Sequence, residues 1–181
     1  MRSTAVAAAI LLAAVTACTG AAAARQPIPT PIGAGAAYRP AAGSHGAPGL
    51  RCARASRPRF GAHLELFANR RVVLVPAGIG VGRDGGCSYP ARTREPTGVV
   101  EVAAGAGLTL GHLFAIWGRR VSRSQLLGFR ARPGEPLRAF VNGRPWRGDP
   151  RSIPLRRHAQ IVLEIRGYVP PHASYRFPPG L

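Results

Sequence analysis

The sequence predicts a small α+β fold in which a mixed β-sheet carries one short helix. Short apolar runs with strand-like patterns recur between residues 63 and 165, and one segment between them, 109–118, has apolar residues at helical spacing. The chain has 181 residues, a length typical of one domain, and 46% of them are hydrophobic, enough for one modest core. A multidomain enzyme and a membrane protein with several spans are therefore excluded.

The first strands are expected to form a β-hairpin. Residues 63–68 alternate between polar and apolar side chains, and the run 72–75 follows after a short turn. The glycine-containing segment 77–81 is expected either to continue the second strand past Pro76 or to make a glycine-bent extension of it. Glycines and prolines within 82–97 predict a loop, and 99–102 predicts the next strand.

A short helix is expected to follow. Thr109 suits the N-cap position and Gly118 the C-terminal stop. Between them, apolar residues recur on one helical face: Leu110, Leu113, Phe114 and Trp117. Ser122 is expected to begin a second short helical turn.

The second half of the module predicts another hairpin and a closing strand. Residues 137–141 form an apolar run, Asn142-Gly143 is a strong hairpin-turn signal, and 144–146 would pair back. The run 161–165 is expected to be the last strand. From 99 to 165 the order of elements is similar to the later part of a β-grasp domain, so we expect a β-grasp-like fold, with a small β-sandwich or barrel as the alternative.

The N-terminus has the features of a lipoprotein signal peptide over residues 1–17. Its apolar run, 5–14, is too short to span a bilayer. The sequence Val-Thr-Ala-Cys at 15–18 resembles a bacterial lipobox, which implies lipid attachment to Cys18 at the outer face of the cytoplasmic membrane. The alternative is ordinary cleavage after the alanines at 21–24, giving a secreted protein.

Composition divides the remaining chain into three parts. Residues 18–58 are rich in Pro, Ala and Gly and predict a tether. Residues 59–167 predict the folded module, and 168–181, with four prolines, an irregular tail that either docks through its aromatic residues or stays disordered. Outside the cytoplasm Cys52 and Cys87 are expected to form a disulfide, with two free thiols as the alternative.

The charge is strongly basic, with 25 basic and 7 acidic residues and a formal net charge of +18; every basic residue is arginine. Guanidinium groups bind phosphate in a bidentate way, so the arginines predict contact with anionic phospholipid or cell-wall polymer. No nucleic-acid-binding motif occurs, and the alternative is the codon bias of a GC-rich genome. The candidate anion-binding residues are Arg92, Arg94, Arg119, Arg120, Arg123, Arg156 and Arg157.

Catalytic and cofactor motifs are absent from the sequence, so neither an enzyme nor a bound cofactor is expected. The histidines are widely spaced, and no metal site is predicted. A fold could still unite His63 with Glu65, Glu95 or Glu101, and His63 and Glu101 are kept as weak candidate ligands.

Several motifs together resemble an uncharacterised family of secreted and membrane-anchored prokaryotic proteins. They are HLELFANRRVVLVPAGIG (63–80), a cysteine followed by TG (87–98), TLGHLFAIWG (109–118) and VNGRPWRGDPRSIPL (141–155). In many relatives the loop after the cysteine reads like His-Thr-His-Asp and a further histidine follows in the strand, a set that could bind metal.

At the matching positions this chain has Arg92, Arg94 and Glu101, with Glu95 in place of the acid. Protonated arginine does not ligate metal. The resemblance therefore implies that a metal site in the relatives would be lost here. It leaves two hypotheses: a lipid-anchored binding module of the envelope with an unknown ligand, or a metal-binding or redox accessory protein whose family site has degenerated.

Overall fold

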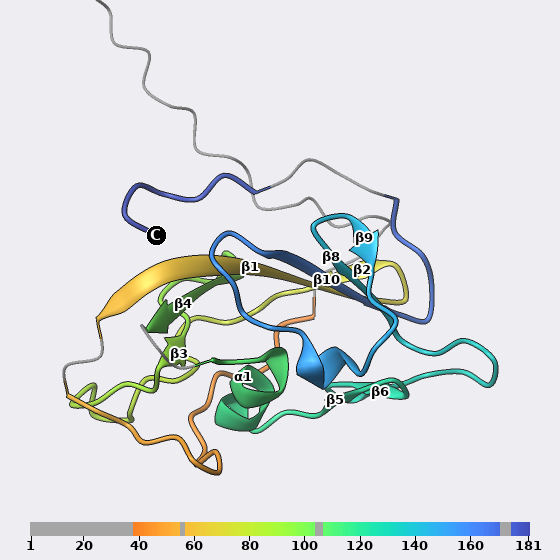
Figure 1. The fold of residues 1–181 in the computed structure, drawn as a ribbon. Helices are drawn as coiled ribbons and strands as arrows, with labels where there is room; N and C mark the ends of the chain where they lie inside the picture. The colour runs from red at the N-terminus through yellow and green to blue at the C-terminus, as the bar shows by residue number, and fades with distance from the viewer. Residues whose placement is uncertain (1–37, 55–56, 104–106, 171–174) are drawn as a thin grey trace, which may run out of the picture.

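The computed structural model describes residues 38–54, 57–103, 107–170 and 175–181. It confirms a mostly β, mixed α+β fold with two sheets and one short α-helix (Figure 1). The strands are β1 (Pro58–Ala68), β2 (Arg71–Val73), β3 (Ala91–Arg92), β4 (Val99–Ala103), β5 (Val121–Ser122), β6 (Gln125–Leu126), β7 (Phe129–Arg130), β8 (Arg138–Val141), β9 (Arg144–Pro145) and β10 (Gln160–Ile165).

The main sheet is built around β1. Its strand order is β3-β4-β1-β10-β8-β9, and β2 also pairs with β1. The first half of β1 runs antiparallel to β4, the second half antiparallel to β2, and its other side runs parallel to β10, with His63 opposite Gln160. The hairpin expected over 63–75 is confirmed, although β1 begins earlier, at Pro58, where the chain already pairs with β4.

The segment 77–81 does not extend the hairpin. It makes consecutive turns instead, with Gly78 at φ 84° and Gly80 at φ 73°. A Cβ atom at Gly80 would lie 2.2 Å from the carbonyl oxygen of Ala91, so the close approach of two backbone segments requires glycine there. Val81 then forms an isolated bridge to Ser88.

The single α-helix, α1 (Leu110–Trp117), matches the prediction. Its first turn is closed by His112, whose Nδ1 accepts the backbone amide of Thr109 at 3.0 Å. Gly118 ends the helix in the left-handed conformation at φ 67°. His112 is therefore a capping residue of α1.

The prediction of a second helical turn beginning at Ser122 is wrong. Strands β5, β6 and β7 form a small antiparallel sheet there. The hydroxyl of Ser122 accepts the amide of Ser124 at 3.2 Å, which closes a tight turn two residues on instead of capping a helix. Leu127, at φ 54°, forms the next turn.

The Asn142-Gly143 hairpin is confirmed. Both residues have positive φ, 51° and 74°, as the tight turn between β8 and β9 requires. A short 3-10 helix, η1 (Pro150–Ser152), follows and packs near α1 before the chain enters β10.

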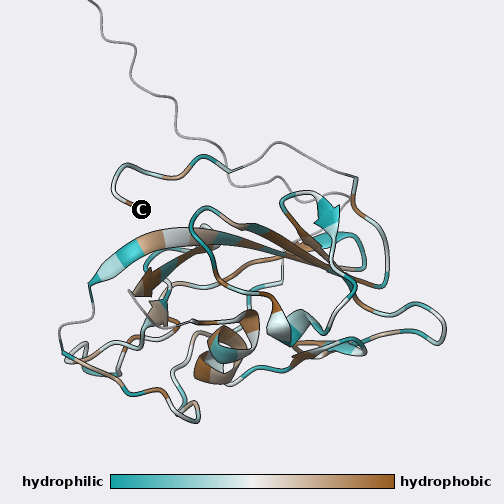
Figure 2. Ribbon diagram, viewed as in Figure 1, coloured by the Kyte–Doolittle hydropathy of each residue, from teal (hydrophilic) through white to brown (hydrophobic). Residues whose placement is uncertain are grey.

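The core lies between α1 and one face of the main sheet. Alternate residues of β1 and β10 point into it, among them Leu64, Leu66 and Leu163, and meet Phe114 and Trp117 of the helix. Figure 2 shows the hydrophobic residues gathered on the central strands and on part of α1.

Residues 38–54, which their composition assigned to the tether, pack against the module. The indole Nε1 of Trp117 donates to the carbonyl oxygen of Ala41 at 3.0 Å. The backbone amide of His45 donates to the carbonyl oxygen of Ile116 at 2.7 Å. Ala47 is buried in the core. Backbone groups thus supply the contacts that the apolar pattern of this segment did not predict.

The C-terminal tail, residues 175–181, lies on the face of the sheet opposite α1 (Figure 1). Tyr175 stacks on His63, and Phe177 stacks on His158. Tyr168 is about half exposed, with the guanidinium of Arg138 over its ring. Residues 1–17, expected to be a signal peptide, and Cys18 lie outside the described residues. Within the described part, no helix is long and apolar enough to cross a bilayer.

Candidate functional site: the polar face of the sheet and the disulfide loop

The second face of the main sheet carries ionisable residues. Because side chains alternate along a strand, the residues of β1 between its core positions point away from α1. His63 and Glu65 of β1, Glu101 of β4 and Glu164 of β10 are all less than a tenth exposed on this face. Buried charged groups gather at functional sites as well as in structural networks, which makes this face the candidate site.

His63 and Glu65 form a buried pair near the middle of the face. Nδ1 of His63 lies 3.3 Å from Oε1 of Glu65, and Nε2 lies 3.0 Å from the carbonyl oxygen of Thr97. A carbonyl oxygen only accepts hydrogen bonds, so Nε2 carries a hydrogen. Nδ1 of the same ring faces the Glu65 carboxyl group, so both ring nitrogens of His63 point at oxygen atoms.

The tail covers this pair. The ring of Tyr175 stacks on that of His63 with centroids 4.1 Å apart, and its backbone is held by a reciprocal pair of hydrogen bonds with the amide side chain of Gln160. His63 is 1% exposed. The stacked tail therefore leaves His63 almost no surface for direct contact with a substrate.

Arg92, Arg94 and Glu101 lie together in the structure. Nε of Arg92 lies 2.8 Å from Oε2 of Glu101, and Nε of Arg94 lies 2.9 Å from Oε1. Arg92 also donates to the hydroxyl of Ser88 at 2.6 Å. One carboxylate therefore compensates two guanidinium groups, and Arg92 is buried rather than presented to an external anion.

His63 and Glu101, the weak metal candidates, lie on the same face but bind other groups. Gly61, rather than His63, is opposite Glu101 in the register of β1 and β4. The part of the chain that the structure describes contains no group of three His, Cys, Asp or Glu side chains able to hold a metal ion.

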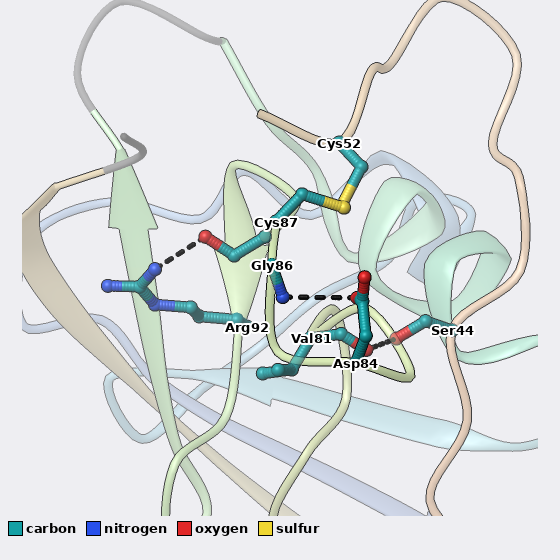
Figure 3. Close-up of a disulfide and its surroundings, with 8 residues drawn as sticks. Ser44, Cys52, Val81, Asp84, Gly86, Cys87 and Arg92 are labelled. Carbon is teal, nitrogen blue, oxygen red and sulfur yellow. Dashed lines mark hydrogen bonds between the residues drawn. A yellow bond between two sulfur atoms is a disulfide. The ribbon is translucent and has the colours of Figure 1, made fainter. Parts of the chain in front are cut away.

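A disulfide between Cys52 and Cys87 is present beside this network (Figure 3). It joins the packed segment 38–54 to the loop before β3, and the backbones of Ala53 and Ser88 exchange two hydrogen bonds next to it. In the same loop the Asp84 carboxylate accepts the amide of Gly86 at 3.0 Å (Figure 3). The expected pairing of the cysteines is confirmed, and it is consistent with an extracytoplasmic protein.

Thr93, in the loop that follows Cys87, is fully buried. Its hydroxyl donates to the carbonyl oxygen of Pro76 at 2.6 Å and accepts the amide of Ile79 at 3.1 Å. It therefore fixes the turns of the VPAGIG motif against the loop that follows the cysteine, which gives that motif a structural role.

The other candidate anion-binding arginines are exposed: Arg119, Arg120, Arg123, Arg156 and Arg157. None of these five forms a salt bridge among the described residues, although the pKa of Asp149, lowered mainly by hydrogen bonds from Arg151, is also lowered by the charge of Arg123. Arg123 donates to the backbone of Arg147, and Arg157 donates to the backbone of Arg59, bonds that fix the side chains without neutralising them. Arg123 is thus held beside the segment that follows β9, and Arg157 is held beside the start of β1.

Sequence reasoning missed the burial of the His63–Glu65 pair and of Glu164, because a tail rich in proline gives no periodic signal that it will cover a sheet.

No family model, curated protein or solved structure matches this chain.

Proposed function

We propose that this protein is a lipid-anchored module of the cell envelope that binds anionic surfaces through its exposed arginines. The observation that carries the proposal is the uncompensated charge. If all seven acidic residues paired with an arginine, a net charge of +18 would still remain, and Glu101 alone takes two of the partners. The excess is therefore free to attract phosphate or carboxylate groups.

The compartment supports this choice of ligand. The lipobox-like sequence ending at Cys18 and the Cys52–Cys87 disulfide both favour a location outside the cytoplasm. There the abundant anions are phospholipid headgroups and wall polymers. Juxtamembrane arginines gain about 1 kcal/mol each near an anionic membrane surface, so a few of them suffice for measurable binding.

A β-grasp-like assignment of the main sheet belongs to the same proposal. Its support is the strand order β4-β1-β10-β8-β9, in which the first and last strands form a parallel central pair flanked by antiparallel partners. Folds of this kind serve unrelated functions, so the assignment describes a scaffold and does not choose a ligand.

The alternative of a metal-binding or redox accessory protein has less support. The positions that match the relatives' histidines hold Arg92, Arg94 and Glu101, and these three side chains satisfy one another. Elemental analysis of the purified full chain would restore this alternative if it found stoichiometric metal.

Cell fractionation tests the proposal. The wild-type chain is expected to incorporate a metabolic lipid label, and Cys18→Ala is expected to lose it. The unlabelled Cys18→Ala chain should still sediment with the envelope at low salt and be released at high salt, because exposed charges are screened. Incorporation of the lipid label by the Cys18→Ala chain would overturn the proposal that Cys18 carries the anchor. Release of that chain from the envelope at low salt would overturn the proposal of surface binding.

A further inference from the structure

A groove opens between the main sheet and the loop that precedes β10, at the end of the core where Phe60 of β1 pairs with Val102 of β4. It encloses about 380 Å³. The residues that define this Phe60 groove are Phe60, Val102, Leu108, Leu155, Arg156 and Arg157.

The floor of the groove is apolar and closed. Val102, Leu108 and Leu155 are each less than 5% exposed and belong to the main core. The backbone amide of Leu155 donates to the carbonyl oxygen of Leu108 at 2.8 Å, which joins the two walls. The volume falls in the range of small-molecule sites, which is about 300–1,000 Å³.

The rim is cationic and held in place. Arg157 donates to the carbonyl oxygen of Arg59 at 2.5 Å, and its guanidinium carbon lies 5.7 Å from the centre of the Phe60 ring. The next residue, His158, anchors the loop, since its amide donates to the carbonyl oxygen of Gly61 at 2.7 Å. Arg156, which precedes Arg157, is exposed, and none of the described residues that line the groove is acidic.

An apolar floor beside two arginines fits a ligand that is both apolar and anionic. We propose that the Phe60 groove binds one anionic phospholipid, with the phosphate on Arg156 and Arg157 and the adjoining apolar part of the lipid on the floor. A bidentate guanidinium–phosphate contact gives the head its position. A wall polymer of sugars and phosphates would leave the apolar floor unfilled, so the membrane is the source that the groove favours.

This inference rests on the proposed function, because it names the ligand that one part of the basic surface recognises. The groove proposal predicts that arginines at different places on the surface contribute unequally to binding, which general charge attraction does not predict. Loss of two arginines at the groove should matter more than loss of two arginines elsewhere on the surface. The hairpin residues Arg144 and Arg147 offer a matched control, since both are exposed, carry the same charge and lie outside the groove.

Vesicle binding of the full chain tests the difference. All variants carry Cys18→Ala, so that no acyl anchor forms, and binding to neutral phosphatidylcholine vesicles is subtracted. On equimolar phosphatidylcholine and phosphatidylglycerol, Arg156→Gln/Arg157→Gln is expected to weaken binding roughly 25-fold, and Arg144→Gln/Arg147→Gln less than about threefold. Far-ultraviolet circular dichroism confirms that both variants fold.

A soluble probe separates the lipid from a bare phosphate. Titration with monomeric octyl phosphate should shift the backbone amide signals of the groove residues, at concentrations at which inorganic phosphate produces no shift. The Arg156→Gln/Arg157→Gln chain should show a much weaker shift. Equal loss in the two double variants, or equal affinity for octyl and inorganic phosphate, would overturn the groove proposal alone. Failure of the parent Cys18→Ala chain, with all its arginines in place, to bind anionic vesicles would overturn the proposed function as well.

Discussion

Arg92 and Glu101 form an ion pair across β3 and β4, with Nε of the arginine 2.8 Å from Oε2 of the glutamate and both side chains about nine-tenths buried. Nε of Arg94, on a largely exposed side chain, lies 2.9 Å from Oε1 and donates to Oε2 at 3.0 Å. The two arginines thus share one carboxylate, but the buried charge of Arg92 needs it more than the solvated charge of Arg94 does.

Replacement of the shared carboxylate should be costly. Glu101→Gln removes the carboxylate that the buried Arg92 guanidinium contacts, and we expect a loss of about 3–5 kcal/mol in the free energy of unfolding. Arg94→Gln is the matched control and should cost less than about 1 kcal/mol, because its charge is solvated. Urea unfolding measures both. Equal losses would show that burial of Arg92 does not determine the cost.

The disulfide should stabilise the chain mainly by restricting the unfolded state. Cys52 and Cys87 are 35 residues apart, and a loop of that size is worth roughly 3–4 kcal/mol in the chain-entropy model. Cys52→Ser/Cys87→Ser should therefore unfold at lower urea concentration, and a reducing agent should lower the stability of the parent chain but not of the variant. A parent chain insensitive to reduction would contradict the bond.

The tail should be dislodged by one methyl group at Gly61. A Cβ atom there would lie 3.0 Å from the ring of Phe177, which is tighter than ordinary contact. Gly61→Ala is expected to cost about 1–3 kcal/mol in an otherwise unchanged chain, and much less in a Phe177→Ala background. A double-mutant cycle by urea unfolding measures this coupling. Additive effects would mean that Phe177 does not rest on Gly61.

Asp149 should give the stability a component that is lost in acid. Hydrogen bonds from the Arg151 side chain and backbone hold the pKa of the Asp149 carboxyl below its usual 3.8. Because the folded pKa is the lower one, the stabilisation is complete above pH 3.8 and disappears as the pH falls through the folded value. Carboxyl-carbon NMR should show this midpoint below 3.8 and closer to it at high salt. A midpoint at or above 3.8 would exclude the interaction in solution.

The regular elements could be predicted from the sequence because each has a local signal. Thr109 and Gly118 mark the ends of α1, and Asn142-Gly143 marks the β8–β9 turn. The small β5–β7 sheet could not be predicted in this way, since two-residue strands have no periodicity and the hydroxyl of Ser122 serves a turn as readily as a helix cap.

The candidate site was predictable only in part. Cysteine counting indicated the disulfide, but no local signal indicated that Arg92 would be buried against Glu101. The sequence did not show that Tyr175 would cover His63, because that contact joins distant parts of the chain through a segment without apolar periodicity. Nor did it distinguish the buried Arg92 from the exposed Arg156, which differ only in tertiary surroundings.

The central claim is that exposed arginines bind the protein to anionic surfaces, and the salt dependence of vesicle binding tests it most directly. The full chain with Cys18→Ala is titrated with vesicles of equimolar phosphatidylcholine and phosphatidylglycerol over a range of sodium chloride concentrations. The Debye length falls from about 30 Å at 0.01 M to about 3 Å at 1 M salt, so the binding constant should fall by more than about tenfold over that range. Binding that is independent of salt, or equally strong on neutral vesicles, would contradict the account.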